Sequence, residues 1–173
     1  MINNDIKDLN RTKLSEQDDL NVLLAEATEK ADVRAVKRLL RNGANPNYHR
    51  DGESPFWNLQ YCEGGGDLTA YNNKRLEIAL LYLQYGADPY LSVDGDKLLY
   101  YVSYCLYEDR NDKDELYVYR SRFFVLLLFF SGELTSLKNN PNFTLKDLLH
   151  YRFEYRHKPC IINEFGEVAL ELK

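Results

Sequence analysis

The chain has 173 residues and a formal net charge of −5, with an apolar fraction of 45% and a charged fraction of 28%. These values are ordinary for one soluble globular domain, and they argue against a nucleic-acid backbone or an anionic membrane as the partner. The N-terminus lacks the apolar stretch of a secretory signal, and the three cysteines form no even disulfide framework. We therefore expect a cytoplasmic protein.

We expect the N-terminal unit, residues 14–50, to hold two helices. The stretch LSEQDDLNVLLAEAT supplies the first helix and covers one end of the domain. The second helix follows Asp32, a residue type that often caps a helix N-terminus, and ends at Gly43, which adopts the left-handed conformation that stops a helix. Its apolar residues recur at helical spacing and indicate one buried face. They are Val33, Val36, Leu39 and Leu40.

The stretches 43–57 and 86–100 carry the same pattern, in which a Gly-Ala pair, a proline and an Asp-Gly pair coincide. Self-similarity at a fixed spacing is the mark of an internal repeat. Each stretch predicts an extended finger that carries an Asp-Gly turn, followed by a helix. In the first copy, Ser54 is the expected N-cap and Pro55 the first helical residue.

Two further helices are expected to end at glycines in the same manner. RLEIALLYLQY precedes Gly86, and SRFFVLLLFFSG ends at Gly132. The third stretch is apolar almost all round, as expected of a helix buried between neighbours. Each unit is therefore predicted to be a helix, a glycine stop, an extended finger and a helix start. The expected buried positions are Leu76, Ala79, Leu80 and Leu83 in the second stretch and Phe124, Leu127, Leu128 and Phe129 in the third.

This pattern resembles the ankyrin repeat, whose units join a Gly-Ala-Asp helix end to an Asp-x-x-Gly-x-Thr-Pro-Leu-His helix start. Here the matching phrases are VRAVKRLLRNGANPN, DGESPFW, LEIALLYLQYGADP and DGDKLLY. The resemblance runs from about Val22 to Tyr104. Trp57 and Tyr100 stand where the family has His, and the spacing is 43 residues instead of about 33. The resemblance implies an all-α, ankyrin-like helical repeat solenoid of about three helix pairs, with lengthened connections inside the repeats and short fingers.

The whole chain, 1–173, is then expected to be a single ankyrin-like domain. Its expected parts are repeat 1 with the N-terminal cap at 14–50, repeat 2 at 51–93, repeat 3 at 94–140 and a C-terminal cap at 141–173. In this last part, Thr144 is the expected N-cap of a helix that seals the final repeat. Residues 159–173 favour either a hairpin around Gly166 or a short helix.

The extra length of each unit falls between its two helices. The first insert, EGGGDLTAYNNK at 63–74, carries three glycines and predicts a flexible loop. The second insert, EDRNDKDELYVYR at 108–120, is rich in acidic residues and is expected to lengthen both flanking helices. Each insert is either a solvated connection or a recognition tip, and both interpretations stay open.

No catalytic or metal-binding set stands out in the sequence. EGGGD lacks the Lys-Ser/Thr pair of a phosphate-binding loop. His150, His157 and Cys160 match no familiar zinc spacing and lack a fourth ligand. Cys62 and Cys105 occupy equivalent positions in successive repeats and are expected to be small core residues. We therefore expect a protein that is not an enzyme and that uses no cofactor and no metal.

Binding is the function that remains, and fourteen tyrosines supply the large, amphipathic contact area typical of interfaces. Tyr100, Tyr104 and Tyr107 share one helix face, which is either core or interface. The fingers and Tyr101 are the better exposed candidates, and the acidic insert is expected to meet a basic patch of the partner. The expected partner-binding residues are Tyr48, Arg50, Glu53, Tyr90, Tyr101, Glu108, Asp109 and Asp112.

Three functions compete. The first, favoured by small size and acidic charge, is a bacterial immunity protein that neutralises a cognate toxin, as stand-alone immunity proteins of this fold do in families that the chain resembles. The second is an ankyrin effector or host-range factor that binds a eukaryotic protein. The third is an enzyme or metal-binding protein that uses His150, His157 and Cys160. For the first two the expected partner is a protein, not a nucleic acid or a membrane, and the free chain is expected to be a monomer.

Overall fold

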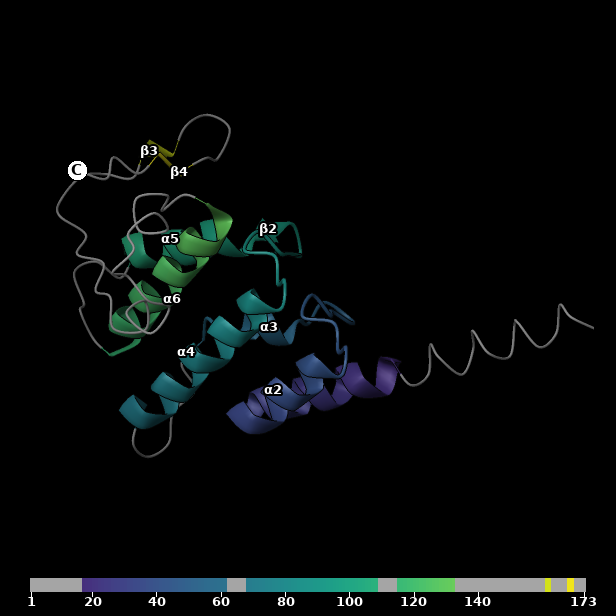
Figure 1. Ribbon diagram of the computed structural model, residues 1–173. Helices are drawn as coiled ribbons and strands as arrows, with labels where there is room; N and C mark the ends of the chain where they lie inside the picture. Colours follow the sequence, from purple (N-terminus) through teal and green to yellow (C-terminus); the bar gives the residue numbers. More distant parts are fainter. Residues whose placement is uncertain (1–16, 62–67, 109–114, 133–160, 163–167, 170–173) are drawn as a thin grey trace, which may run out of the picture.

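The computed structural model describes residues 17–61, 68–108, 115–132, 161–162 and 168–169 (Figure 1). These residues are mostly helical, in agreement with the expected all-α class. A first helical segment covers residues 17–29. The further helices are α2 (Val33–Arg41), α3 (Pro55–Asn58), α4 (Leu68–Gln84), α5 (Leu98–Glu108) and α6 (Glu115–Ser131), and the strands are β1 (Ser92–Val93), β2 (Asp96–Lys97), β3 (Ile161–Ile162) and β4 (Val168–Ala169).

The helix α2 begins and ends where its sequence signals place it. Asp32 caps the helix, since its Oδ1 accepts a hydrogen bond of 3.0 Å from the Ala35 amide. The chain leaves the helix through Gly43, which has a φ of 94°. Gly86 after α4 has a φ of 93°, and Gly132 after α6 has a φ of 96°, in the left-handed region that favours glycine. The predicted glycine stops are therefore confirmed.

The same backbone hydrogen bonds close the ends of α2 and α4. The amides of Gly43 and Gly86 each donate to the carbonyl three residues earlier, and the amides of the alanines that follow each donate to the carbonyl five residues earlier. Asn45 and Asp88 then each accept, through a side-chain oxygen, a hydrogen bond from the amide two residues further on. The repetition seen in the sequence is thus present in the geometry as well.

Each finger turns through its Asp-Gly pair, as predicted. In the first finger the φ angles are 54° at Asp51 and 81° at Gly52. In the second finger they are 53° at Asp94 and 93° at Gly95. Two consecutive residues with positive φ form the two-residue turn that suits the twist of a hairpin. Accordingly β1 pairs antiparallel with β2, and the residues on either side of the first turn form an isolated antiparallel bridge.

The helix α3 opens as predicted but is short. Ser54 Oγ accepts a hydrogen bond of 3.3 Å from the amide three residues on, and Pro55 is the first helical residue. Side chains from α4 and α6 bind the carbonyls at its C-terminal end. Arg75 donates to the Asn58 carbonyl at 2.6 Å, and the Tyr119 hydroxyl donates to the carbonyl that follows. These partners satisfy groups that every helix end leaves open, and α3 ends after about one turn.

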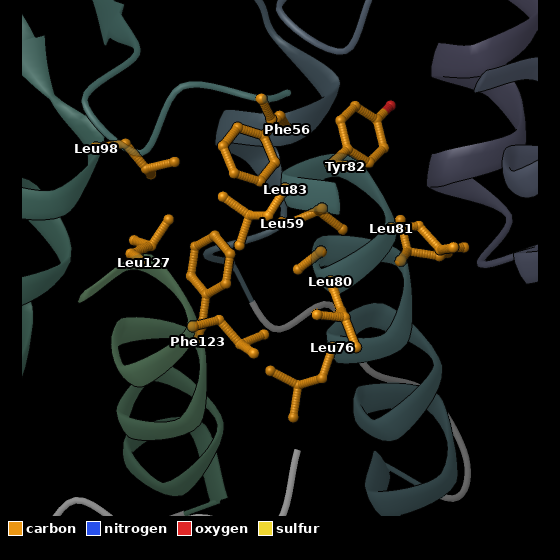
Figure 2. Packing of buried hydrophobic residues seen from close by; sticks show 14 of the residues in the cluster. Phe56, Leu59, Leu76, Leu80, Leu81, Tyr82, Leu83, Leu98, Phe123 and Leu127 are labelled. Atoms are coloured by element: carbon orange, nitrogen blue, oxygen red, sulfur yellow. The ribbon is translucent and has the colours of Figure 1, made fainter. Parts of the chain in front are cut away.

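The core lies between the helices that precede the glycine stops. The helix α2 packs against α4, α4 packs against α6, and α6 packs against α5. Phe56 stacks on Tyr82 with ring centroids 5.4 Å apart and meets Phe123 edge-on at 6.1 Å (Figure 2). The helix α6 is buried along most of its length, as predicted. No helix within the described ranges is long and apolar enough to cross a membrane.

The first insert departs from the predicted loop. Because α4 begins at Leu68, residues 68–74 of the insert form about two turns of helix instead. This segment contains no glycine or proline, and its Tyr71 packs against the core, so it extends α4 toward its N-terminus. Residues 63–67, which include the three glycines, lie outside the described part of the chain.

The second insert agrees with the prediction, since α5 continues to Glu108 and α6 begins at Glu115. In the C-terminal part, β3 pairs antiparallel with β4, with Ile161 opposite Ala169. Of the two alternatives for this part, the structure therefore has the hairpin. The expected N-cap Thr144 lies outside the described residues.

Candidate protein-binding surface

The two fingers are tied together through Asn47. Its side-chain amide donates a hydrogen bond of 3.0 Å to the Gly86 carbonyl, and its Oδ1 accepts one of 2.7 Å from the Asp88 amide. The first finger is bound in the same way. The Gln17 side-chain amide donates a hydrogen bond of 2.9 Å to the Gly43 carbonyl, and Oδ1 of Asn21 accepts one of 2.7 Å from the Asn45 amide. Each finger is therefore held at its base by amide side chains from the segment before it.

The tips of the two fingers are exposed and close together. A Cβ placed on Gly52 would lie 3.7 Å from Oδ1 of Asp94, which belongs to the second tip. In the first finger, Arg50 Nε lies 3.5 Å from Oδ2 of Asp51. A hydrogen bond to Tyr48 raises the pKa of the Arg50 guanidinium above its ordinary value. Figure 1 shows both fingers on the same side of the helices.

An aromatic cluster joins α3 to α5. The rings of Trp57 and Tyr101 lie 5.4 Å apart at an angle of 47°. Trp57 is buried, and Tyr101 is half-buried. Burial, together with the neighbouring groups of Cys105 and Tyr61, raises the pKa of Tyr101 to about 12. Tyr101 is therefore a packed residue, and the expectation that it is well exposed was wrong. Cys105 is likewise half-buried, not a core residue.

Tyr61 and Tyr104 are the exposed tyrosines of this region, with 38% and 54% of their surface accessible. They occupy equivalent positions 43 residues apart. The tyrosine face of α5 is not core, because Tyr100 and Tyr107 are only half-buried and the buried face of α5 consists of other residues. These are Leu98, Leu99, Val102, Ser103 and Leu106.

The predicted contact residues differ in their exposure. The exposed ones are Arg50, Glu53 and Glu108. The half-buried ones are Tyr48, Tyr90 and Tyr101. Asp109 and Asp112 lie outside the described residues. The structure thus brings charged groups of the predicted set to the surface and holds its tyrosines against neighbouring residues.

The predicted set of contact residues omitted several exposed residues of the fingers and first helices, although the face that carries Tyr104 had been left open as core or interface. Among them are Tyr61, Asp94, Tyr104 and Asp96. The signal for the two tyrosines was their shared place in the repeat, since a residue type that recurs at equivalent positions faces the same way in each unit. The signal for the two aspartates was the Asp-Gly turn. Asp94 belongs to this turn, and Asp96 follows it in the second strand of the finger.

Charge is distributed unequally over the molecule. We call residues 17–32, 42–61 and 85–108 the first-helix layer, and the helices α2, α4 and α6 the second-helix layer. The first-helix layer carries eleven Asp or Glu and three Lys or Arg, whereas the second-helix layer carries two Glu and eight Lys or Arg. The segments of the first-helix layer, which include the fingers and the exposed Tyr61 and Tyr104, are therefore acidic, whereas the helices of the second-helix layer are basic.

Within the described residues, no group of three His, Cys, Asp or Glu side chains is placed to hold a metal ion. His150, His157 and Cys160 lie outside that part of the chain. Comparisons with protein-family models, with curated proteins and with solved structures gave no match to this chain. Its function is therefore inferred from its own residues.

Proposed function

We propose that the chain is an ankyrin-like, non-enzymatic binding module that recognises a basic protein through its first-helix layer. The repeated glycine stops, Asp-Gly turns and finger ties support the ankyrin-like arrangement. The observation that carries the proposal is the excess of carboxylates in this layer, next to tyrosines that are exposed without being needed for the core.

An acidic surface attracts a basic protein before contact, because complementary charge acts mainly on the association rate. The basic second-helix layer repels the same partner, so productive approach is favoured from one direction. After contact, Tyr61 and Tyr104 supply large amphipathic area at a low cost in side-chain entropy, which is typical of interface hot spots. Charge thus governs encounter in this proposal, and the tyrosines govern the lifetime of the complex.

The most specific form of the proposal is an immunity protein that neutralises a bacterial toxin. A nuclease toxin presents a basic surface, because it must hold the phosphates of its substrate. The acidic first-helix layer is complementary to such a surface and would cover it. A neighbouring gene for a large secreted toxin would favour this form over an effector that binds a eukaryotic protein.

The test is capture of the partner from the native host with the tagged chain, followed by binding kinetics of two charge-reversed variants. The test variant combines Glu53→Lys and Asp96→Lys, which lie in the fingers and are exposed. The matched control combines Glu77→Lys and Glu115→Lys, which are exposed in the second-helix layer. Both variants change the net charge by the same amount, and the control also removes the hydrogen bond of 2.9 Å from Thr69 to Glu115, so its melting temperature is compared with that of the wild type.

At low salt the finger variant is expected to associate about tenfold more slowly and with a flatter salt dependence. The control is expected to stay within about twofold of the wild type, since its charges lie on the other layer. Tyr61→Ala with Tyr104→Ala is expected to speed dissociation about tenfold or more while leaving the fold intact. Equal slowing by both charge variants would contradict recognition through the first-helix layer.

A further inference from the structure

The exposed face of α2 is a continuous basic stripe. It consists of Arg34, Lys37, Arg38 and Arg41, all exposed. Residues at this spacing lie on one side of a helix, one above the other. The opposite side of α2 is buried in the core, so the stripe is the face that remains for a partner.

The four cations of the stripe have no acidic partner among the described residues. The two ion pairs there, Lys30 with Glu26 and Arg50 with Asp51, both lie in the first-helix layer. The described part of the chain contains more carboxylates than cations, so the lack of pairing on α2 is not a shortage of acid. Most of the described carboxylates lie in the first-helix layer, and α2 itself contains none.

The stripe works against the stability of its own helix. Like charges three and four residues apart repel each other, and α2 contains four such pairs within nine residues. Arg38 and Arg41 lie in the last turn, where the helix dipole favours cations. Arg34 lies in the first turn, where the dipole disfavours them. Helix stability therefore does not account for the stripe as a whole, and a local arrangement that opposes stability is a mark of a functional surface.

We propose that the α2 stripe docks an acidic segment of a protein partner. From residue 34 to residue 41 the stripe is about 10 Å long, which matches two turns of an acidic helix. Three of its four cations are arginines, whose planar guanidinium groups bind carboxylates in a bidentate manner. This surface is independent of the first-helix layer, so the failure of either proposal leaves the other standing.

The other polyanions fit the stripe less well. An extended nucleic acid reaches beyond about 10 Å and meets the acidic layer of a chain whose net charge is −5. The sequence of α2 offers no aromatic side chain on which a base can stack. A membrane-surface helix needs a free apolar face, whereas the apolar face of α2 is buried. The observations therefore favour carboxylates presented by a protein segment.

The probe is a fluorescein-labelled peptide of about 12 residues, with glutamates at positions i, i+3, i+4 and i+7 in an alanine background. Its binding is followed by fluorescence anisotropy at low salt. The stripe variant replaces all four cations of the stripe with Glu. The matched control replaces four exposed cations elsewhere with Glu: Lys30, Arg50, Lys74 and Lys97.

The stripe variant is expected to bind the peptide at least about tenfold more weakly, and the control to lose no more than about twofold. Equal losses in both variants, or no binding by the wild type, would overturn the proposal. Tighter binding of a DNA oligonucleotide of the same charge would overturn it in favour of a nucleic acid. The molecular mass in solution distinguishes a second copy of the chain from another protein. If the wild type formed larger species as its concentration rises while the stripe variant stayed a monomer, the stripe would bind a second copy of the chain.

Arg34→Glu alone separates a binding role from a structural one. The change removes two repulsive pairs and places an acid in the first turn, so the melting temperature is expected to rise by about 1–3 °C. Peptide binding is expected to weaken at the same time. If the stripe stabilised the fold, Arg34→Glu would lower the melting temperature. Either a lower melting temperature or unchanged peptide binding would contradict the proposal.

Discussion

The two fingers resemble each other far more closely than the two helices that follow them. Gly43 and Gly86 have φ angles of 94° and 93°, and the hydrogen bonds after them recur one by one. The helices that open behind the fingers differ, since α3 has four residues and α5 has eleven. The turns within each finger are made by residues that are close in sequence, whereas side chains from α4 and α6 bind the carbonyls at the end of α3. Local turn chemistry therefore recurs even where the packing around it changes.

The largest expected effect lies in the packed region around α3. Phe123 is fully buried, meets Phe56 edge-on and stacks on Tyr119 at 6.4 Å. Phe123→Ala removes these contacts and leaves a cavity, so we expect the free energy of unfolding to fall by about 3–5 kcal/mol in a urea titration. Tyr104→Ala, at an exposed site, is the control and should cost less than about 0.5 kcal/mol. Similar costs for the two variants would refute the packing described around α3.

The equivalence of the two glycine stops is tested by Gly43→Val and Gly86→Val. At both sites an added Cβ meets no atom within 4 Å, so the cost comes chiefly from the left-handed backbone conformation. We expect each change to lower the free energy of unfolding by about 1–2 kcal/mol, and by the same amount within error. Costs that differ by more than about 1 kcal/mol would show that the two fingers are not equivalent.

A smaller effect is expected where the fingers are tied together. Asn47→Ala removes two hydrogen bonds to the backbone of the second finger, at an exposed site. The expected loss is about 1 kcal/mol of unfolding free energy, measured by urea titration. Asn42→Ala is the control, because Asn42 is exposed and only its backbone takes part in the end of α2. If the two variants were equally stable, the tie would contribute nothing.

A further effect, confined to alkaline pH, originates in the aromatic cluster. The pKa of Tyr101 is raised to about 12 in the folded protein, chiefly by burial, whereas a tyrosine in an unfolded chain has a pKa of about 10. The folded state thus holds this proton more strongly, and the resulting stability is fully present below about pH 10 and is lost as the pH rises toward about 12. Tyr101→Phe should therefore lose less stability than the wild type between these pH values in urea titrations. Parallel losses would indicate that Tyr101 is not packed as described.

The sequence was sufficient for features that depend on neighbouring residues. Asp32 and Ser54 were predicted as N-caps and the glycines as stops, because each acts through hydrogen bonds or φ angles within a few residues. The Asp-Gly turns belong to the same class. The exposed pair Tyr61 and Tyr104 was open to the same reasoning, through the spacing of the repeat, but the sequence alone left their face between core and interface.

The sequence was not sufficient where distant residues decide. Residues 68–74 were predicted as a loop because of the glycines before them, yet they join α4, and Tyr71 packs against the core. The half-buried state of Tyr101 depends on Trp57, a full repeat earlier in the chain. The contrast between acidic segments and basic helices likewise became visible only once the helix bounds were known, because acidic and basic segments alternate along the chain.

The most direct test of the proposed function is hydrogen exchange of the chain with and without its captured partner. Recognition through the first-helix layer is expected to slow exchange of the backbone amides in both fingers, residues 48–53 and 90–97, and in the N-terminal turns of α5. The exposed face of α4 should exchange at the same rate in both samples. Slowed exchange confined to α2 and α4, with unchanged fingers, would contradict the account.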